Sequence, residues 1–81
     1  MVLTIRINGT LSQEIGSTRI QVDLQENATV NDLISQLAVR YPLAEATLQN
    51  AIPFAAGKHL SPETVLTSTT QLALLMPIAG G

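Results

Sequence analysis

The segment from Leu72 to Met76 constrains the fold more than any other part of the chain. All of its residues are apolar (Leu-Ala-Leu-Leu-Met), so a strand formed here has no polar face. Strands of this kind are usually central in their sheet, because both of their faces are covered. The rest of the chain must therefore supply strands beside this segment and a layer that covers it.

Two segments near the N-terminus alternate between apolar and polar side chains, with the period of a half-buried strand. The first runs from Met1 to Asn8 and the second from Thr18 to Leu24. We expect them to pair antiparallel, because little sequence separates them. The side chains predicted to face the core are Leu3, Ile5, Ile7, Ile20, Val22 and Leu24.

The connection between these two strands allows two structures. Asn8-Gly9 favours a tight hairpin turn. Leu11 and Ile15, four residues apart and followed by Gly16, favour a short helical turn instead. The sequence is compatible with a direct hairpin and with a hairpin widened by a helix.

The clearest predicted helix begins after Thr29. The Thr29 hydroxyl and the Asp32 carboxylate have the spacing of a capping box, which satisfies free backbone N–H groups in the first turn. Pro42 ends the helix, and Arg40 lies in the last turn, where the helix dipole favours a cation. Apolar residues at helical spacing form one stripe that a sheet must cover: Val30, Leu33, Ile34, Leu37 and Tyr41.

Shorter elements are predicted between Pro42 and the final strand. Residues 43–48 are compatible with another helical turn, and residues 51–56 with a short strand. Pro53 has no N–H group, so we expect this strand at an edge of the sheet. Gly57-Lys58 is predicted to be a turn, after which His59-Leu60 pairs briefly.

This order of elements predicts an α+β protein. We expect a ubiquitin-like β-grasp roll: a mixed sheet of four to five strands, with one main helix across one face. The first and last strands are the most apolar, so they should lie side by side and parallel at the centre. Residues 1–81 are interpreted as a single domain, with residues 77–81 as a protruding C-terminal tail.

The composition argues against several classes of function. Charged residues make up only 12% of the chain and hydrophobic residues 46%, with a formal net charge of −2. The basic residues form no stripe with aromatic residues between them, so we expect no nucleic-acid binding. No apolar run has the roughly 20 residues of a membrane span, and no signal peptide is evident. The basic residues are Arg6, Arg19, Arg40 and Lys58.

The chain also lacks the side chains of a typical catalytic or metal site. Cysteine is absent, which favours the cytoplasm and excludes a thiol nucleophile. The single histidine, His59, has no carboxylate pair near it in sequence and is interpreted as a solvated turn residue rather than a metal ligand. No residues resemble a nucleophile with its base. We therefore expect no metal site, no bound cofactor and no catalysis by this chain alone.

The remaining candidate is the tail that ends in Gly80-Gly81. Two given positions are both glycine by chance in about 0.5% of cases. Glycine has no side chain to block a narrow channel, and Pro77 prevents further ladder pairing at its own nitrogen. A carboxyl end of this kind is suited to reach into the active site of another protein. The simpler interpretation is an idle end of small residues.

The ending Pro77-Ile78-Ala79-Gly80-Gly81 resembles the terminal signature of the MoaD/ThiS family of ubiquitin-like sulfur carriers, and the chain length favours the MoaD branch. The resemblance implies that an ATP-dependent, E1-like (MoeB-like) enzyme adenylates Gly81, and that sulfur then replaces the adenylate as a thiocarboxylate. In the MoaD branch the carrier is the small subunit of molybdopterin synthase. Its tail enters the large, MoaE-like subunit and donates sulfur to a pyranopterin precursor of the molybdenum cofactor.

Further residue roles follow from the same resemblance. Gly80 and Ala79 would line the inserted tail, with Ile78 and Pro77 at its base. Independently of the resemblance, an apolar final strand exposed on the sheet face opposite the helix would form a partner surface, and Leu75 and Phe54 are predicted to belong to it. The alternatives are a sulfur carrier for thiamine, cysteine or another pathway, and a protein modifier joined to lysines through Gly81.

The chain departs from the family pattern at three places. Residues 67–71 (Thr-Ser-Thr-Thr-Gln) replace a frequent acidic, glycine-containing turn, and Met76-Pro77 replaces a frequent pair of prolines. Residues 52–56 lack the usual Val-Asn. These departures bear on which activating enzyme and which acceptor the chain serves.

Overall fold

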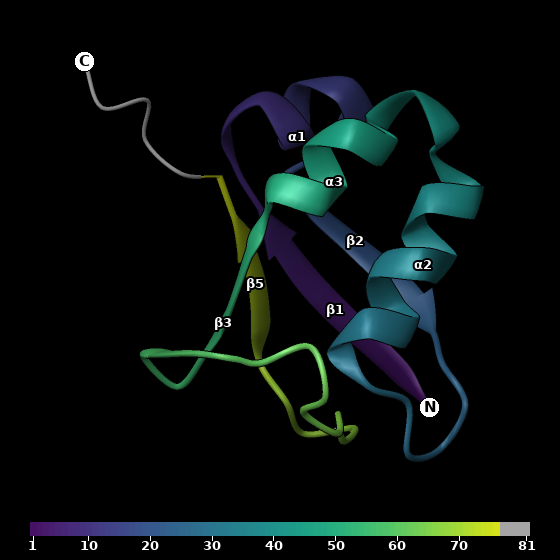
Figure 1. Ribbon diagram of the computed structural model, residues 1–81, viewed down its shortest axis with the longest axis vertical. Coiled ribbons are helices and arrows are strands. Elements are labelled where there is room, and N and C mark those ends of the chain that lie inside the picture. Colours follow the sequence, from purple (N-terminus) through teal and green to yellow (C-terminus); the bar gives the residue numbers. More distant parts are fainter. Residues whose placement is uncertain (77–81) are drawn as a thin grey trace.

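A computed structural model of the protein describes residues 1–76, which form one mixed sheet with helices across one face (Figure 1). The strand order is β2-β1-β5-β3-β4. The strands are β1 (Val2–Ile7), β2 (Arg19–Asp23), β3 (Ile52–Ala55), β4 (Lys58–His59) and β5 (Leu72–Leu75). The helices are α1 (Gly9–Ile15), α2 (Val30–Arg40), the 3-10 helix η1 (Pro42–Ala44) and α3 (Glu45–Asn50). The predicted ubiquitin-like β-grasp roll is confirmed.

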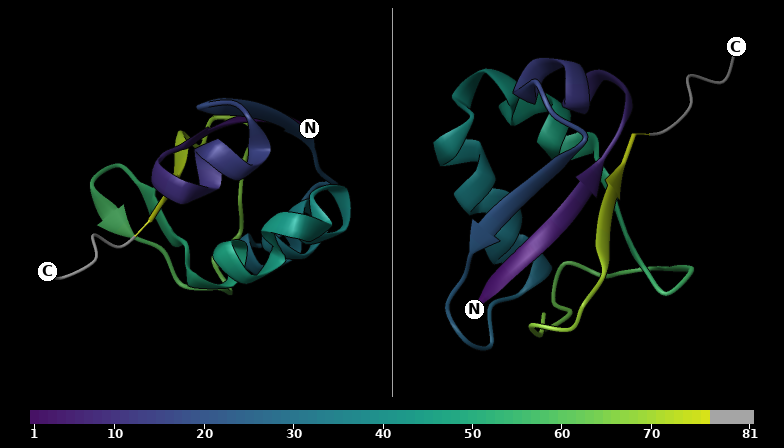
Figure 2. Two further views of the ribbon diagram at one scale, coloured as in Figure 1. Left: turned by 90° about the horizontal axis from the view of Figure 1, so that it is seen from above. Right: turned by 180° about the vertical axis from the view of Figure 1, so that it is seen from behind.

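The apolar final strand lies at the centre of the sheet, as its sequence predicts. β5 pairs parallel with β1, with Ile5 opposite Leu72 and Ile7 opposite Leu74. On its other side β5 pairs antiparallel with β3. Figure 2 shows from two further directions that α1, α2 and α3 all lie on the same side of this sheet. The opposite face of the sheet carries no helix among residues 1–76.

The open question about the first connection is settled in favour of the widened hairpin. β1 and β2 pair antiparallel, and α1 lies between them. Gly16 ends α1 with φ +87°, and its N–H donates to Ser12 O at 2.8 Å. Glycine is favoured there because a Cβ atom strains the backbone in the left-handed region.

The main helix begins and ends where the sequence predicts. Asp32 N–H donates to Thr29 Oγ1 at 3.2 Å, and Thr29 N–H donates to Asp32 Oδ2 at 2.9 Å, which completes the capping box. The helix ends at Arg40, two residues before Pro42. Arg40 Nη1 donates to Gln21 O at 2.9 Å, which ties the end of the helix to β2. The predicted turn in residues 43–48 is present as η1 and α3.

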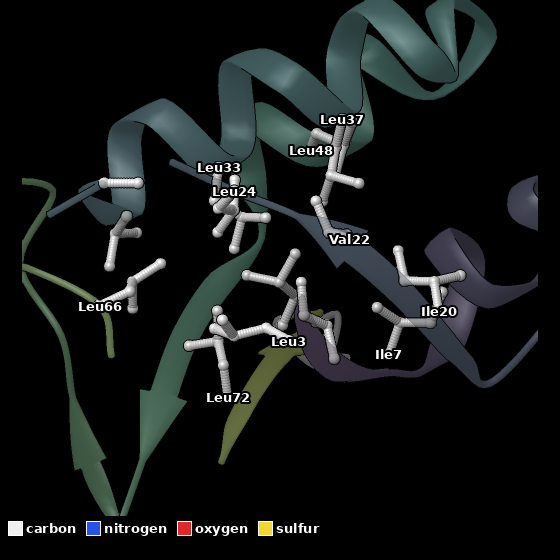
Figure 3. Close-up of a cluster of buried hydrophobic side chains, with 14 of the residues drawn as sticks. Leu3, Ile7, Ile20, Val22, Leu24, Leu33, Leu37, Leu48, Leu66 and Leu72 are labelled. Carbon is white, nitrogen blue, oxygen red and sulfur yellow. The ribbon is translucent and has the colours of Figure 1, made fainter. Parts of the chain in front are cut away.

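The core lies between the helices and the inner sheet face (Figure 3). All six side chains that the N-terminal alternation places inward are buried. Leu66, for which the sequence indicates no role, is also buried, because its loop is bonded to the start of α2. Leu66 N–H donates to Ala28 O at 2.8 Å, and Val30 N–H donates to Thr64 O at 3.0 Å. These bonds fix the long connection between β4 and β5.

The edge position predicted for the strand that contains Pro53 is wrong. Pro53 does not lie in an edge strand, since β3 has β5 on one side and β4 on the other. The carbonyl of Pro53 accepts from Leu60 N–H at 2.9 Å, just past the end of β4. Nitrogen and carbonyl of one strand residue point to the same side, so the missing N–H falls where β4 has already ended.

The turn after β3 is shifted by one residue from the predicted Gly57-Lys58. Its central residues are Ala56 and Gly57, with φ +53° and +73°, and Lys58 already belongs to β4. Two positive φ values are the geometry of the tight turn that matches the twist of a hairpin. Alanine is unusual at the first of these positions, so the sequence predicted a turn that begins one residue later, at Gly57.

Candidate functional site

The tail residues on which the sequence-based prediction depends lie outside the described residues. They are Pro77, Ile78, Ala79, Gly80 and Gly81. What the structure describes is the base from which they continue, at the C-terminal end of β5. There Leu75 ends the strand and Met76 follows it.

Met76, at the C-terminal end of β5, is hydrogen-bonded to Asn8, which lies between β1 and α1. Met76 N–H donates to the side-chain Oδ1 of Asn8 at 2.9 Å. Asn8 occupies the N-cap position of α1 but makes no side-chain capping bond there. Gly9 has φ +58°, and a Cβ atom added to it would lie 3.3 Å from Met76 Cβ. Asn8 and Gly9 therefore set the position from which the chain leaves the central strand.

We expect Asn8→Ala to lower the free energy of unfolding by about 1 kcal/mol, because it removes the acceptor for the Met76 N–H. Hydrogen exchange at the Met76 amide should become faster. Asn8→Asp is the matched control, since a carboxylate oxygen can accept the same bond and the exchange rate should stay close to that of the parent chain. Equal protection of Met76 in both variants would show that the bond does not hold the base.

Leu75 and Phe54, the two predicted partner contacts, do lie on the same face of the sheet. Ile52 is opposite Leu75 and Phe54 is opposite Ala73, and directly paired residues share a face. All four side chains are half-buried, whereas the intervening Leu72 and Leu74 are buried on the helix side. We call Ile52, Phe54, Ala73 and Leu75 the apolar outer patch.

His59 borders this patch rather than standing alone in a solvated turn. It is opposite Phe54, and the two ring centroids are 5.7 Å apart with planes inclined by 26°. His59 remains exposed, so its ring extends the apolar outer patch toward solvent through the stacking contact with Phe54. This arrangement follows from the short β4. The sequence predicted brief pairing at His59-Leu60, and the structure has it at Lys58–His59.

Two of the four basic residues are brought together, which the sequence analysis missed. Arg6 of β1 is directly opposite Arg19 of β2, and both are exposed on the outer sheet face. The alternation of the two strands already places both outward. Only the register of the strands, which no sequence signal specified, puts them side by side.

Among residues 1–76, no buried side chain is polar or charged. In the same part of the chain, no three His, Asp or Glu side chains gather closely enough to hold a metal ion. No helix within it has the length and apolar character needed to cross a membrane. The surface features described here, namely the base of the tail, the apolar outer patch and the arginine pair, are thus the candidate site.

Comparisons with known proteins find solved structures of the same fold. SAMP1, the small archaeal modifier protein 1 of Haloferax volcanii, has a TM-score of 0.86 with 21% identity over 100% of both chains. A putative molybdopterin converting factor subunit 1 from Pyrococcus furiosus has a TM-score of 0.84 with 16% identity, over 96% of this chain and 99% of that one. A chain from a complex of subunits 1 and 2 of the molybdopterin-converting factor of Helicobacter pylori has a TM-score of 0.69 with 16% identity over 100% of both.

At these identities the solved structures show a shared fold. No curated protein matches the sequence significantly. The sequence profile of the ThiS family, in contrast, matches residues 5–81, which is nearly the whole chain and includes the terminal glycines. This protein therefore belongs to the ThiS family of ubiquitin-like sulfur carriers.

Proposed function

We propose that the chain is the sulfur-carrying small subunit of a molybdopterin synthase. In this role Gly81 is adenylated, converted to a thiocarboxylate and inserted into a MoaE-like large subunit, where it donates sulfur to a pyranopterin precursor. A MoeB-like, E1-type enzyme uses ATP for the activation. All of these steps take place in the cytoplasm, and the chain itself binds no cofactor.

The observation that carries this proposal is the family match through Gly81 on a chain without cysteine. A carrier with no thiol has to hold sulfur elsewhere, and a terminal carboxylate can do so. A carboxylate oxygen attacks the α-phosphorus of ATP, and pyrophosphate leaves. Hydrosulfide then attacks the acyl carbon, the new C–S bond replaces the C–O bond to the phosphate, and AMP leaves. The product is a thiocarboxylate at Gly81.

The apolar outer patch supports a role for this face in docking. Leu75 and Phe54 are both half-buried there, and Leu75 is the last residue of β5, directly before Met76. A partner that covers this patch would also receive residues 77–81. The likeness to a subunit 1 that occurs in a complex with subunit 2 agrees with such a partner.

Intact mass spectrometry tests the proposal directly. The chain is incubated with a MoeB-like enzyme, ATP and sulfide, and its mass is expected to rise by the difference between a sulfur and an oxygen atom. Omission of ATP should prevent the gain. The modified chain should then convert precursor to molybdopterin with a MoaE-like subunit. No mass gain with an enzyme that modifies its own partner carrier would contradict the proposal.

A second candidate function is protein modification through Gly81. The likeness to the small archaeal modifier protein 1 of Haloferax volcanii favours it. In the same incubation, supplemented with cell extract, this function predicts higher-mass species that contain Gly81 joined to lysine. A carrier for thiamine, cysteine or another pathway would instead gain sulfur and fail to support molybdopterin formation.

A further inference from the structure

A groove of about 650 Å³ lies on the outer sheet face, beside the apolar outer patch. Its floor includes Arg6 of β1 and Arg19 of β2, and one wall is the loop before β5. That loop contributes the hydroxyl groups of Ser68, Thr69 and Thr70, and residues 64–76 contain no charged side chain. The groove therefore combines two cations with neutral donors.

The two arginines form the closer of the two kinds of cross-strand pair that alternate along an antiparallel ladder. Ile7 N–H donates to Thr18 O at 2.9 Å and Leu24 N–H donates to Met1 O at 2.8 Å. Hydrogen-bonded and non-hydrogen-bonded pairs alternate between these two ends of the ladder. Arg6 and Arg19 consequently form a non-hydrogen-bonded pair, in which the Cα atoms are about 4.5 Å apart. Like charges directly opposite each other destabilise a sheet.

Nothing within residues 1–76 relieves this repulsion. The only ion pairs there join the N-terminal amine to Asp23 and Glu26, so no carboxylate lies within 4.0 Å of either guanidinium. Neither arginine side chain makes a hydrogen bond in that part of the chain, and both are exposed. Residues that break a local rule without compensation in the free fold are typical of functional sites.

The groove is continuous with the apolar outer patch. One row of paired residues crosses the sheet from β2 to β4: Arg19, Arg6, Ala73, Phe54 and His59. A partner that covers Phe54 and Leu75 therefore reaches the arginines without leaving the sheet face. Since Arg6 is directly beside Ala73, the charged and apolar parts of this row form one surface.

We propose, on the basis of the carrier function proposed above, that Arg6 and Arg19 bind an acidic segment of the activating enzyme that adenylates the carboxyl end. Guanidinium groups match carboxylates in a two-bond geometry, and two adjacent arginines suit two adjacent acidic side chains. The loop does not resemble a phosphate cradle, because two of its N–H groups, those of Thr67 and Thr70, already donate within the loop. Thr67 N–H donates to Thr70 Oγ1 at 3.0 Å, and Thr70 N–H donates to Thr67 O at 3.0 Å.

The first test is an NMR titration of the full-length, ¹⁵N-labelled chain with a hexaglutamate peptide at constant ionic strength. Saturable shifts are expected at Arg6, Arg19 and the loop that contains Thr69. Arg19→Glu should weaken binding by about tenfold or more. It should also leave the melting temperature unchanged or raise it, because the opposed charges then attract. Lys58→Glu is the matched control: it makes the same charge change on β4, and affinity should stay within about twofold.

Several results would overturn the assignment. These are an absence of saturable shifts, an equal loss of affinity in Lys58→Glu, and tighter binding of inorganic phosphate than of peptide at the same signals. If Arg19→Glu fails to fold, the peptide affinity of Arg19→Gln is compared with that of the parent chain instead, with a smaller charge change. A structural role for the arginine pair alone would change the melting temperature and leave peptide affinity unaffected.

The second test uses the activation assay with a MoeB-like enzyme. Arg19→Glu should raise the KM for the carrier by about tenfold and leave kcat nearly unchanged, because docking is affected and Gly81 is intact. The salt dependence of kcat/KM should become weaker. If the parent chain is never thiocarboxylated, the proposed carrier function is contradicted. The peptide titration then still tests whether the arginines bind acidic side chains. If the parent is thiocarboxylated and Arg19→Glu has the same KM, only the arginine site fails.

Discussion

Leu74→Ala is expected to lower the free energy of unfolding by about 3–4 kcal/mol, the largest loss of stability for any single substitution proposed for this protein. Leu74 is 0% exposed and lies in β5, the central strand, opposite Ile7 of β1. Truncation there leaves a cavity between the sheet and the helices, which the surrounding backbone fills only in part. Domains of this size have roughly 5–15 kcal/mol of stability, so the variant should still fold but unfold at much lower urea concentration.

Leu75→Ala is the matched control in the same strand. Leu75 lies on the outer face and is half-buried, so the expected loss is about 1 kcal/mol or less. Its effect should appear instead in the association with a MoaE-like subunit, which calorimetry can measure. Equal losses of stability in the two variants would contradict the separation of β5 into a core face and a docking face.

Gly81→Ala is expected to produce the largest loss of function, with sulfur incorporation reduced by at least about 100-fold. In the proposed function the added methyl group would have to enter a partner channel that fits a chain without side chains, and a small displacement of the reacting carbonyl is costly. The melting temperature should not change, because the substitution removes no atom from the buried core that residues 1–76 form. Initial rates of thiocarboxylate formation, followed by intact mass, measure the effect.

Gly16→Ala is the matched glycine control and should give the opposite result. Gly16 has φ +87°, and a Cβ atom added there meets no atom within 4 Å. The cost is therefore backbone strain of about 1 kcal/mol, and sulfur incorporation should not change. A normal rate for Gly81→Ala would contradict the role of the terminal glycine, whatever happens in Gly16→Ala.

Much of the fold could be predicted from local patterns. Alternation at Leu3, Ile5 and Ile7 predicted the inner face of β1, because the period of a strand is set by the backbone of the residue itself. The Thr29 and Asp32 spacing predicted the start of α2 for a similar reason, since a capping box involves only neighbouring residues. The wholly apolar β5 predicted its own central place in the sheet.

Features that depend on pairing between distant segments could not be predicted in this way. The choice between a direct and a widened hairpin after Asn8 depended on whether Leu11 finds space in the core, where it is 0% exposed. Pro53 is tolerated inside the sheet because the two residues of β4 pair with Phe54 and Ala55 and require no N–H from Pro53. In both cases the deciding contact joins residues that local sequence patterns do not relate.

The same division applies to the candidate site. The sequence by itself determined which group is proposed to carry sulfur, since a chain without cysteine that ends in Gly80-Gly81 and matches the ThiS family has its carboxyl end as the candidate carrier. Only the tertiary structure decided what surrounds that end. Strand register places Arg6 beside Arg19, and a long-range bond joins Asn8 to Met76. Register and docking are set by the sum of core contacts across the sheet, and no local pattern encodes that sum.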